Sequence, residues 1–122
     1  MIVFRPELEK VRIARDHVAE ITTDWPVNEY FIRLVASELV TNAVRHAATE
    51  VIRVHACAGE GVYVIEVWDA DRRPPVPAAQ PLCPESPGGR GLWIVTDCAD
   101  RWGVRHDDDD GGKVVYAQWT RH

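Results

Sequence analysis

Three polar side chains recur at steps of four in an otherwise apolar stretch of the chain. They are Glu38, Asn42 and His46, within residues 34–48, LVASELVTNAVRHAA. Residues four apart share one face of a helix, so a carboxylate, an amide and an imidazole would form one polar stripe. A helix that is apolar on its other sides is buried, and buried polar groups cost free energy unless they have partners. We therefore expect other polar side chains or a polar ligand along this stripe.

A further carboxylate, Asp69, stands at the end of a predicted strand. Tyr63, Ile65 and Val67 alternate with other residues and so share one face of the strand 62–68. Asp69 continues that alternation. If this face covers the core, Asp69 points inward beneath the helices.

A glycine-rich turn precedes a short apolar segment later in the chain. Gly88, Gly89 and Gly91 lead into residues 92–98, which we expect to be helical. Backbone N–H groups at the start of a helix suit a phosphate. The preceding loop, 70–88, holds six of the eight prolines, which predicts a long irregular loop of the kind that often covers a site.

Three segments in this order resemble the N, G1 and G2 boxes of the GHKL (Bergerat-fold) ATP-binding superfamily. They are ELVTNAVRH at 38–46, VWDADRRPP at 67–75 and GGRGLWIV at 88–95. Within that superfamily, the chain is most similar to the anti-sigma-factor serine kinases and related short regulatory ATP-binding proteins of actinobacteria. The resemblance covers almost the whole chain, including the ending ADRWGV…GGKVVYAQW.

The resemblance implies roles for the polar stripe. Glu38 matches the catalytic general base, which in a kinase takes the proton from a partner's serine hydroxyl. Asn42 matches the asparagine that holds Mg²⁺, a cation that favours oxygen ligands. His46 lies at the end of the box and is assigned to nucleotide binding, although a histidine that only faces the negative end of the helix dipole would also suit this position.

The resemblance also assigns the other two boxes to ATP. Asp69 would accept a hydrogen bond from the exocyclic amine of adenine, and Asp71 follows it in the same box. Guanine carries a carbonyl oxygen there, and an unpaired buried group costs about 1–3 kcal/mol, so ATP is expected over GTP. The segment that wraps the phosphates is Gly89, Arg90, Gly91 and Leu92.

Two departures from the family pattern keep a second interpretation open. Asp71 replaces the glycine of the usual D-x-G, and Val114 follows Gly112-Lys113 where a threonine is frequent. Both favour a binding module of the same fold without catalysis and with weak or no nucleotide binding. The catalytic half of a split histidine kinase is a third alternative. Without the other boxes, Glu38 and Asn42 would be read as a satisfied polar pair.

The order of the helices and strands expected around these residues predicts an α+β fold. We expect a two-layer sandwich of the Bergerat or histidine-kinase type, with a mixed, mostly antiparallel sheet covered on one face by about three helices. One domain, 1–122, would carry a lid at about 70–90. The expected helices are 7–21, 29–48 (capped by Asn28) and 92–98, and the expected strands are 51–57, 62–68, 101–106 and 113–120.

The charge and composition of the chain indicate which classes of partner and which compartment to expect. The 122 residues carry a formal net charge of −5, which argues against a nucleic-acid binder. The turn 107–110, four aspartates, suits solvent better than a cation. No run reaches membrane-spanning length and no signal-peptide pattern is present, so we expect a cytoplasmic protein whose three cysteines are reduced. By resemblance, its partners would be an anti-sigma-factor antagonist and a sigma factor, and homodimers are common in the family.

Overall fold

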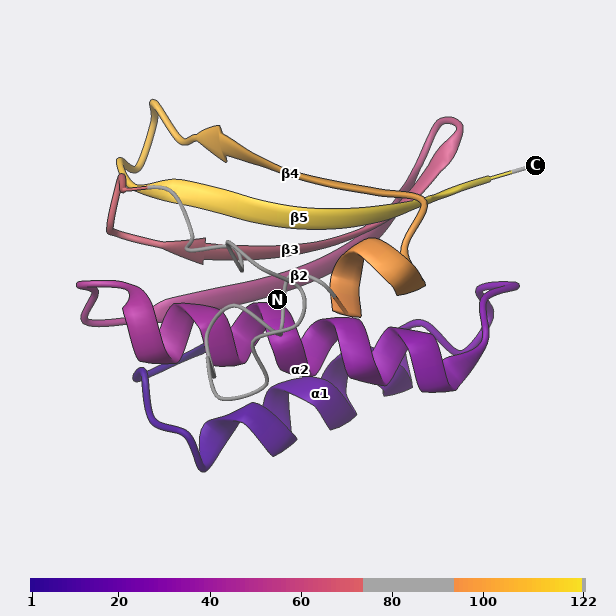
Figure 1. Cartoon of the computed structure of the whole chain (residues 1–122), viewed down its shortest axis with the longest axis horizontal. Coiled ribbons are helices and arrows are strands. Elements are labelled where there is room, and N and C mark those ends of the chain that lie inside the picture. Colours follow the sequence, from indigo (N-terminus) through magenta and orange to yellow (C-terminus); the bar gives the residue numbers. More distant parts are fainter. Residues whose placement is uncertain (74–93, 122) are drawn as a thin grey trace.

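The computed structural model describes residues 1–73 and 94–121, and it stacks one sheet on two main helices (Figure 1). In chain order the elements are β1 (Ile2–Phe4), α1 (Lys10–Ile21), α2 (Glu29–His46), β2 (Ile52–Gly59), β3 (Val62–Asp69), β4 (Arg101–His106) and β5 (Lys113–Thr120). Residues 94–98 form a further short helix before β4. The α+β architecture of the sequence prediction is confirmed.

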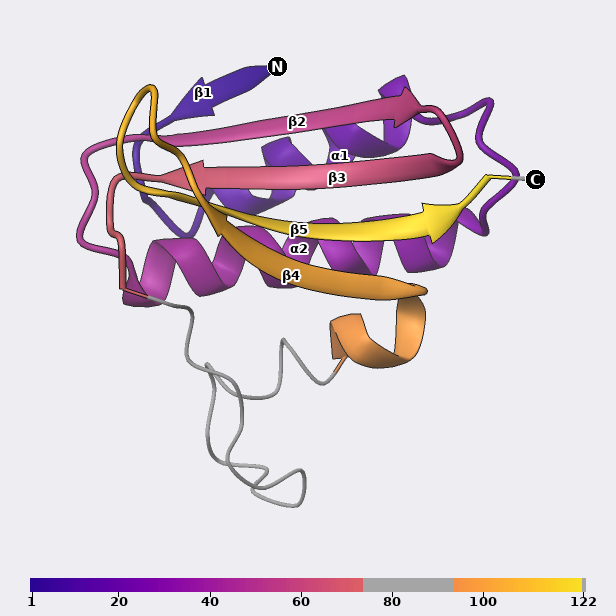
Figure 2. The ribbon, with the colours of Figure 1, turned by 90° about the horizontal axis from the view of Figure 1, so that it is seen from above.

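The five strands run in the order β1-β2-β3-β5-β4, and each pairing between these described strands is antiparallel (Figure 2). Two of the pairings, β2 with β3 and β4 with β5, are hairpins. The central pairing joins β3 to β5, which lie far apart in the sequence. Its register places Asp69 directly opposite Lys113.

Both α1 and α2 lie on the same face of the sheet, as Figures 1 and 2 show from two directions. The core lies between the layers. Ile32 and Leu39 of α2 pack with Ile65 and Val67 of β3, and all four side chains are buried. Because Val67 and Asp69 share a strand face, the same alternation that builds the core turns Asp69 inward, as expected.

The helix boundaries differ slightly from the expected ones. Asn28 caps α2 as predicted, since its side-chain oxygen accepts a hydrogen bond from the Tyr30 N–H at 2.8 Å. The α1 helix begins at Lys10 rather than at residue 7. The reason is that Lys10 N–H and Val11 N–H bond to carbonyls three residues back, which makes a tighter turn before the α-helix. The short strand β1 was not predicted.

Among the residues that the structure describes, no helix combines the length and the apolar character needed to span a membrane. The predicted phosphate segment, 89–92, and residues 74–90 of the lid predicted at about 70–90 lie outside the described residues.

Candidate nucleotide-binding site

A cavity of about 250 Å³ opens where the C-terminal part of α2 meets the end of β3 and the start of β5. Small-molecule pockets in proteins usually measure roughly 300–1,000 Å³, so this cavity is large enough for part of a nucleotide. The described residues that line it are Asn42, Ala43, His46, Ala47, Asp69, Asp71, Arg73 and Lys113.

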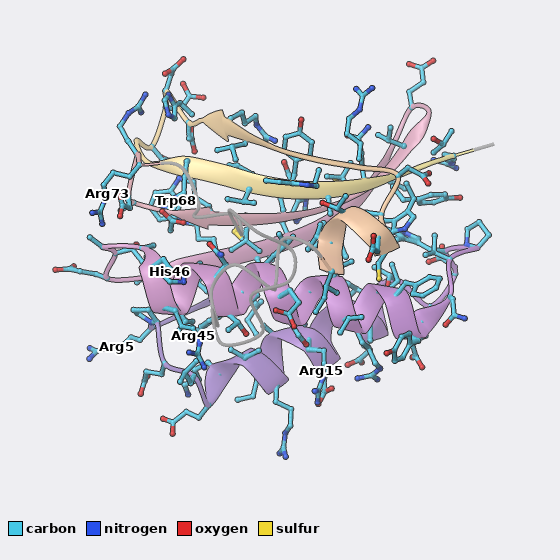
Figure 3. The ribbon with its side chains drawn as sticks, in the orientation of Figure 1. Arg5, Arg15, Arg45, His46, Trp68 and Arg73 are labelled. Atoms are coloured by element: carbon cyan, nitrogen blue, oxygen red, sulfur yellow. The ribbon has the colours of Figure 1, made fainter. Side chains whose placement is uncertain are left out.

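Helix α2 supplies two residues of the predicted polar stripe to this cavity. Asn42 is buried, lines the cavity and lies one turn before the end of the helix. His46 is exposed and is the last residue of α2; Figure 3 shows it at that end of the helix. Glu38 lies one helical turn before Asn42 and is half-buried. It is not among the described residues that line the cavity. The stripe therefore reaches the cavity only through its last two members.

Asp69 and Lys113 form a buried ion pair in the wall of the cavity. Lys113 Nζ donates to Asp69 Oδ1 at 2.8 Å, and the two side chains are only 4% and 1% exposed. The pair forms because the residues are direct cross-strand neighbours on the inner face of β3 and β5. Burial raises the pKa of Asp69 above its ordinary value, and the neighbouring ammonium group opposes that rise.

The segment after β3 is folded by its own aspartates. Asp69 Oδ1 also accepts from the Asp71 N–H at 2.9 Å, and Asp71 Oδ1 accepts from the Arg73 N–H at 2.9 Å. Aspartate favours such turns because its carboxylate reaches the N–H two residues on. Lys113 Nζ holds the segment from the other side, by donating to the Asp71 carbonyl oxygen at 2.7 Å.

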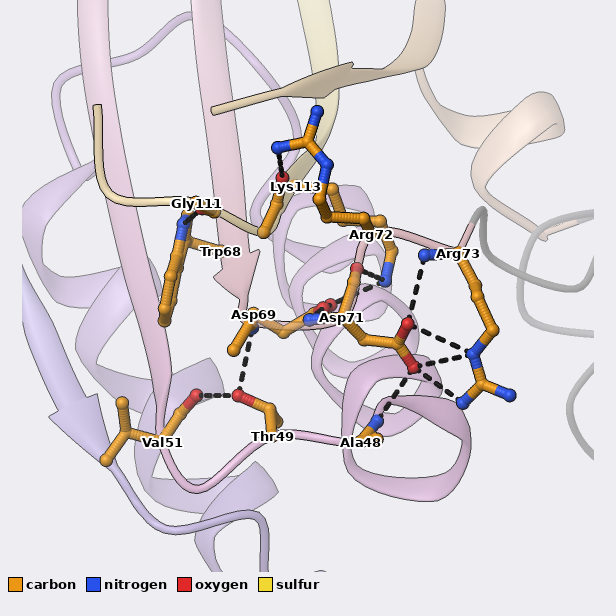
Figure 4. A network of polar contacts seen from close by, with 12 residues as sticks. Ala48, Thr49, Val51, Trp68, Asp69, Asp71, Arg72, Arg73, Gly111 and Lys113 are labelled. Carbon is orange, nitrogen blue, oxygen red and sulfur yellow. Dashed lines mark hydrogen bonds and ion pairs between the residues drawn. The ribbon is translucent and has the colours of Figure 1, made fainter. Parts of the chain in front are cut away.

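The Asp71 carboxylate, which replaces the family's glycine, is occupied by protein partners (Figure 4). Its Oδ2 accepts from the Ala48 N–H at 2.9 Å and from Arg73 Nη2 at 2.7 Å. These donors favour the ionised form, so the pKa of Asp71 lies well below its ordinary value. The negative charge of Asp71 is therefore paired with Arg73, and the carboxylate links the end of β3 to the segment that follows α2.

A second link between the same two segments comes from Thr49. Its hydroxyl donates to the Val51 carbonyl at 2.7 Å and accepts from the Ala70 N–H at 3.0 Å. Thr49 and Asp71 together attach the α2–β2 connection to the tip of β3 (Figure 4). The ends of α2 and β3 are thereby held at a fixed separation across the cavity.

The structure brings together four of the predicted binding residues: Asn42, His46, Asp69 and Asp71. The remaining predicted binding residues, Gly89, Arg90, Gly91 and Leu92, fall outside the described part of the chain. Two charged cavity residues were missed from the sequence, Arg73 and Lys113, and so were the two alanines Ala43 and Ala47. From the sequence alone, Arg73 is interpreted as a solvated loop residue. The structure shows that it pairs with the Asp71 carboxylate.

The fold and the site define a class of protein: an α+β sandwich with a polar cavity between a core helix and the tip of a central strand. A sequence model of the histidine kinase-like ATPase domain matches residues 4–119, and this chain belongs to that family. The GHKL resemblance is confirmed at this level, and ATP binding is what membership implies. No curated protein matches the chain in sequence.

Proposed function

We propose that this protein is a cytoplasmic ATP-binding regulator of the anti-sigma type. It would act as a serine protein kinase on an anti-sigma-factor antagonist and would sequester a sigma factor. One observation carries the nucleotide part of the proposal: the Asp69 carboxylate and the Asn42 amide, which lie 27 positions apart in the sequence, line the same cavity. The choice of partners rests on the resemblance of the sequence boxes.

The residues of the cavity fit ATP in chemical terms. Both hydrogen bonds that the Asp69 carboxylate accepts from described residues go to Oδ1, which leaves Oδ2 to pair with the adenine amine. Asn42 would hold Mg²⁺ through its side-chain oxygen. His46 and Arg73, on the exposed side of the same cavity, would meet the negative charge of the phosphates.

ATP with Mg²⁺ would supply a transferable phosphoryl group and partly neutralise its charge. The task of the chain is then to position the groups and to accept one proton, which a small domain can do. Glu38 is assigned to take the proton from the serine hydroxyl as that oxygen bonds to phosphorus and the bond to the leaving ADP breaks. A serine of the docked antagonist must therefore reach the α2 face that carries Glu38.

A non-catalytic binding module of the same fold is the second candidate. It is favoured by the position of Glu38, which is not among the described residues lining the cavity. Asp71 also favours it. This residue stands where the family has a glycine, and its carboxylate is hydrogen-bonded to Ala48 and Arg73 of the protein itself. Such a protein would bind its partner with little or no dependence on nucleotide.

Calorimetric titration of the purified protein with ATP, with and without Mg²⁺, tests the nucleotide site first. We expect binding that Mg²⁺ strengthens and that Asn42→Ala makes insensitive to Mg²⁺. Thr41→Ala is the matched control, because Thr41 is the preceding residue of α2 and does not line the cavity. Absence of ATP binding to the wild-type protein would reject the regulator and leave the binding module.

Incubation with labelled ATP, Mg²⁺ and a candidate antagonist tests the kinase. Acid-stable label on the antagonist that disappears in Glu38→Ala supports serine phosphorylation. Acid-labile label would support the histidine kinase alternative instead. Tight antagonist binding without label transfer would support the non-catalytic module.

A further inference from the structure

The outer face of the sheet, opposite the helices, carries a second group of chemically active side chains. Among the described residues, one set of three metal-ligating types lies close together: His55, Cys57 and Glu66. One donor atom from each residue falls within 4.8 Å of the others. All three side chains are half-buried.

Strand geometry explains why these residues meet. His55 and Cys57 are two apart on β2, so they share a face, and that face is opposite to the buried Val54. Glu66 of β3 is the direct cross-strand partner of His55. A single ion above the two strands can therefore be reached from all three residues.

His55 supplies an independent observation that points to a ligand. Its Nδ1 atom is buried and has no hydrogen-bond partner among the residues that the structure describes. A buried polar atom without a partner costs free energy, and native structures contain few of them. A metal ion bonded to this nitrogen would remove that cost.

We propose that His55, Cys57 and Glu66 form a binding site for Zn²⁺ or a similar divalent transition metal. The donor set of one nitrogen, one sulfur and one oxygen suits zinc, whereas Mg²⁺ prefers oxygen alone. Tetrahedral zinc places its ligand atoms about 3.5 Å apart, so modest side-chain rotations must draw the three donors together. The site is separate from the nucleotide cavity, with which it shares no residue.

The surroundings leave room for a fourth ligand. A groove of about 160 Å³ runs along the outer face and is lined by His55, Glu66 and Trp68 among others. A water molecule can occupy the remaining position, as in zinc sites with three protein ligands. Zinc binds cysteine as the thiolate, so metal uptake exchanges the Cys57 thiol proton for the ion and releases that proton to the buffer.

Arg105 of β4 competes with the metal. Its guanidinium group forms an ion pair with Glu66. The Arg105 guanidinium holds Glu66 Oε2 and repels a cation bound beside it, and this side chain is mostly exposed and can turn into solvent. Removing Arg105 should therefore tighten metal binding, whereas removing a ligand should weaken it.

Titration of the reduced, nucleotide-free protein with Zn²⁺, in competition with a chromogenic chelator, tests the site. We expect one ion per chain. Cys57→Ser and His55→Gln should each weaken binding at least about tenfold, because loss of a supporting partner alone costs 10–100-fold. Arg105→Gln should strengthen it. Cys98→Ser is the matched control, since Cys98 is also a half-buried free thiol and is not in the group.

Co²⁺ provides a spectroscopic readout that identifies the sulfur ligand. We expect a thiolate-to-metal charge-transfer band that is lost in Cys57→Ser and kept in Cys98→Ser. Circular dichroism of each variant confirms that it is folded. The proposal is overturned if the wild-type chain binds no ion, if the band survives in Cys57→Ser, or if Arg105→Gln binds zinc no tighter than wild type.

Discussion

Gly112 lies against the backbone of Asp69 so closely that a Cβ atom on it would stand 2.0 Å from the Asp69 carbonyl oxygen. Its backbone φ angle of +74° is also one that residues with a side chain rarely adopt. The turn before β5 thus abuts the tip of β3 that carries Asp69, the carboxylate that we propose binds adenine, and only glycine allows this approach.

We predict that Gly112→Ala strongly destabilises the protein and disturbs the cavity. Gly111 is the matched control, because it has the same φ of +74° but an added Cβ would meet nothing within 4 Å. Gly111→Ala should cost only the backbone strain of about 1–2 kcal/mol. Urea unfolding of both variants measures the difference, and equal losses would contradict the close contact with Asp69.

The buried pair of Lys113 and Asp69 should show strong energetic coupling. Lys113→Met leaves a buried carboxylate without its cation, and breaking such a pair costs about 3–5 kcal/mol of the free energy of unfolding. The double variant with Asp69→Asn should lose much less than the sum of the single changes.

A double-mutant cycle by urea unfolding measures this coupling. The pair of Arg33 and Asp16 on the helical surface serves as the control, with a distance of 2.7 Å but two solvent-exposed side chains. Solvent screens such a pair, so its coupling should be much smaller. Similar coupling in the two cycles would contradict the role we give to burial.

Asp71 should make stability depend on pH in the acidic range. Its pKa is lower in the folded protein than in the unfolded chain, so its contribution is complete above the ordinary pKa of an aspartate. As the pH falls below that value, the unfolded chain takes up the proton first and stability is lost. Asp71→Asn should thus lose less stability than wild type between pH 6 and pH 3.

Free energies of unfolding at the two pH values check this prediction. Asp108→Asn, which alters an exposed carboxylate of the β4–β5 turn, is the control and should follow the wild type. A pH dependence in Asp71→Asn as steep as in wild type would show that the contacts with Ala48 and Arg73 do not persist in solution.

Asp69 should also determine the choice of nucleotide, a prediction that rests on the proposed ATP site. A preference for ATP of about 1–3 kcal/mol corresponds to roughly 5- to 150-fold in affinity. Asp69→Asn can donate as well as accept, so the preference should shrink to a few-fold. Competitive displacement of a fluorescent ATP analogue by ATP and by GTP measures the ratio of the two affinities, at a temperature where the variant is folded. The control Asp108→Asn should keep the wild-type ratio.

Local patterns predicted much of this fold. The alternation of Ile65, Val67 and Asp69 predicted an inward carboxylate, and the structure confirms it with a side chain that is 1% exposed. The Asn28 cap of α2 was equally local and is confirmed. These predictions succeeded because each depends on residues within one element.

Features that depend on distant pairings escaped prediction. Lys113 lies 44 residues from Asp69, and only the β3–β5 register brings them together. The three-residue strand β1 exists because it pairs with Val54 and its neighbours in β2, not because its own pattern is strong. The position of Glu38 relative to the cavity likewise follows from how α2 lies on the sheet, which its spacing of four does not specify.

The links from Thr49 and Asp71 across the ends of α2 and β3 have a consequence for kinetics. Hydrogen bonds already join these two walls, so we expect little conformational entropy to be lost there if the proposed adenine site is filled. If the proposed nucleotide site is correct, we expect the base to enter between these two walls in one fast association step.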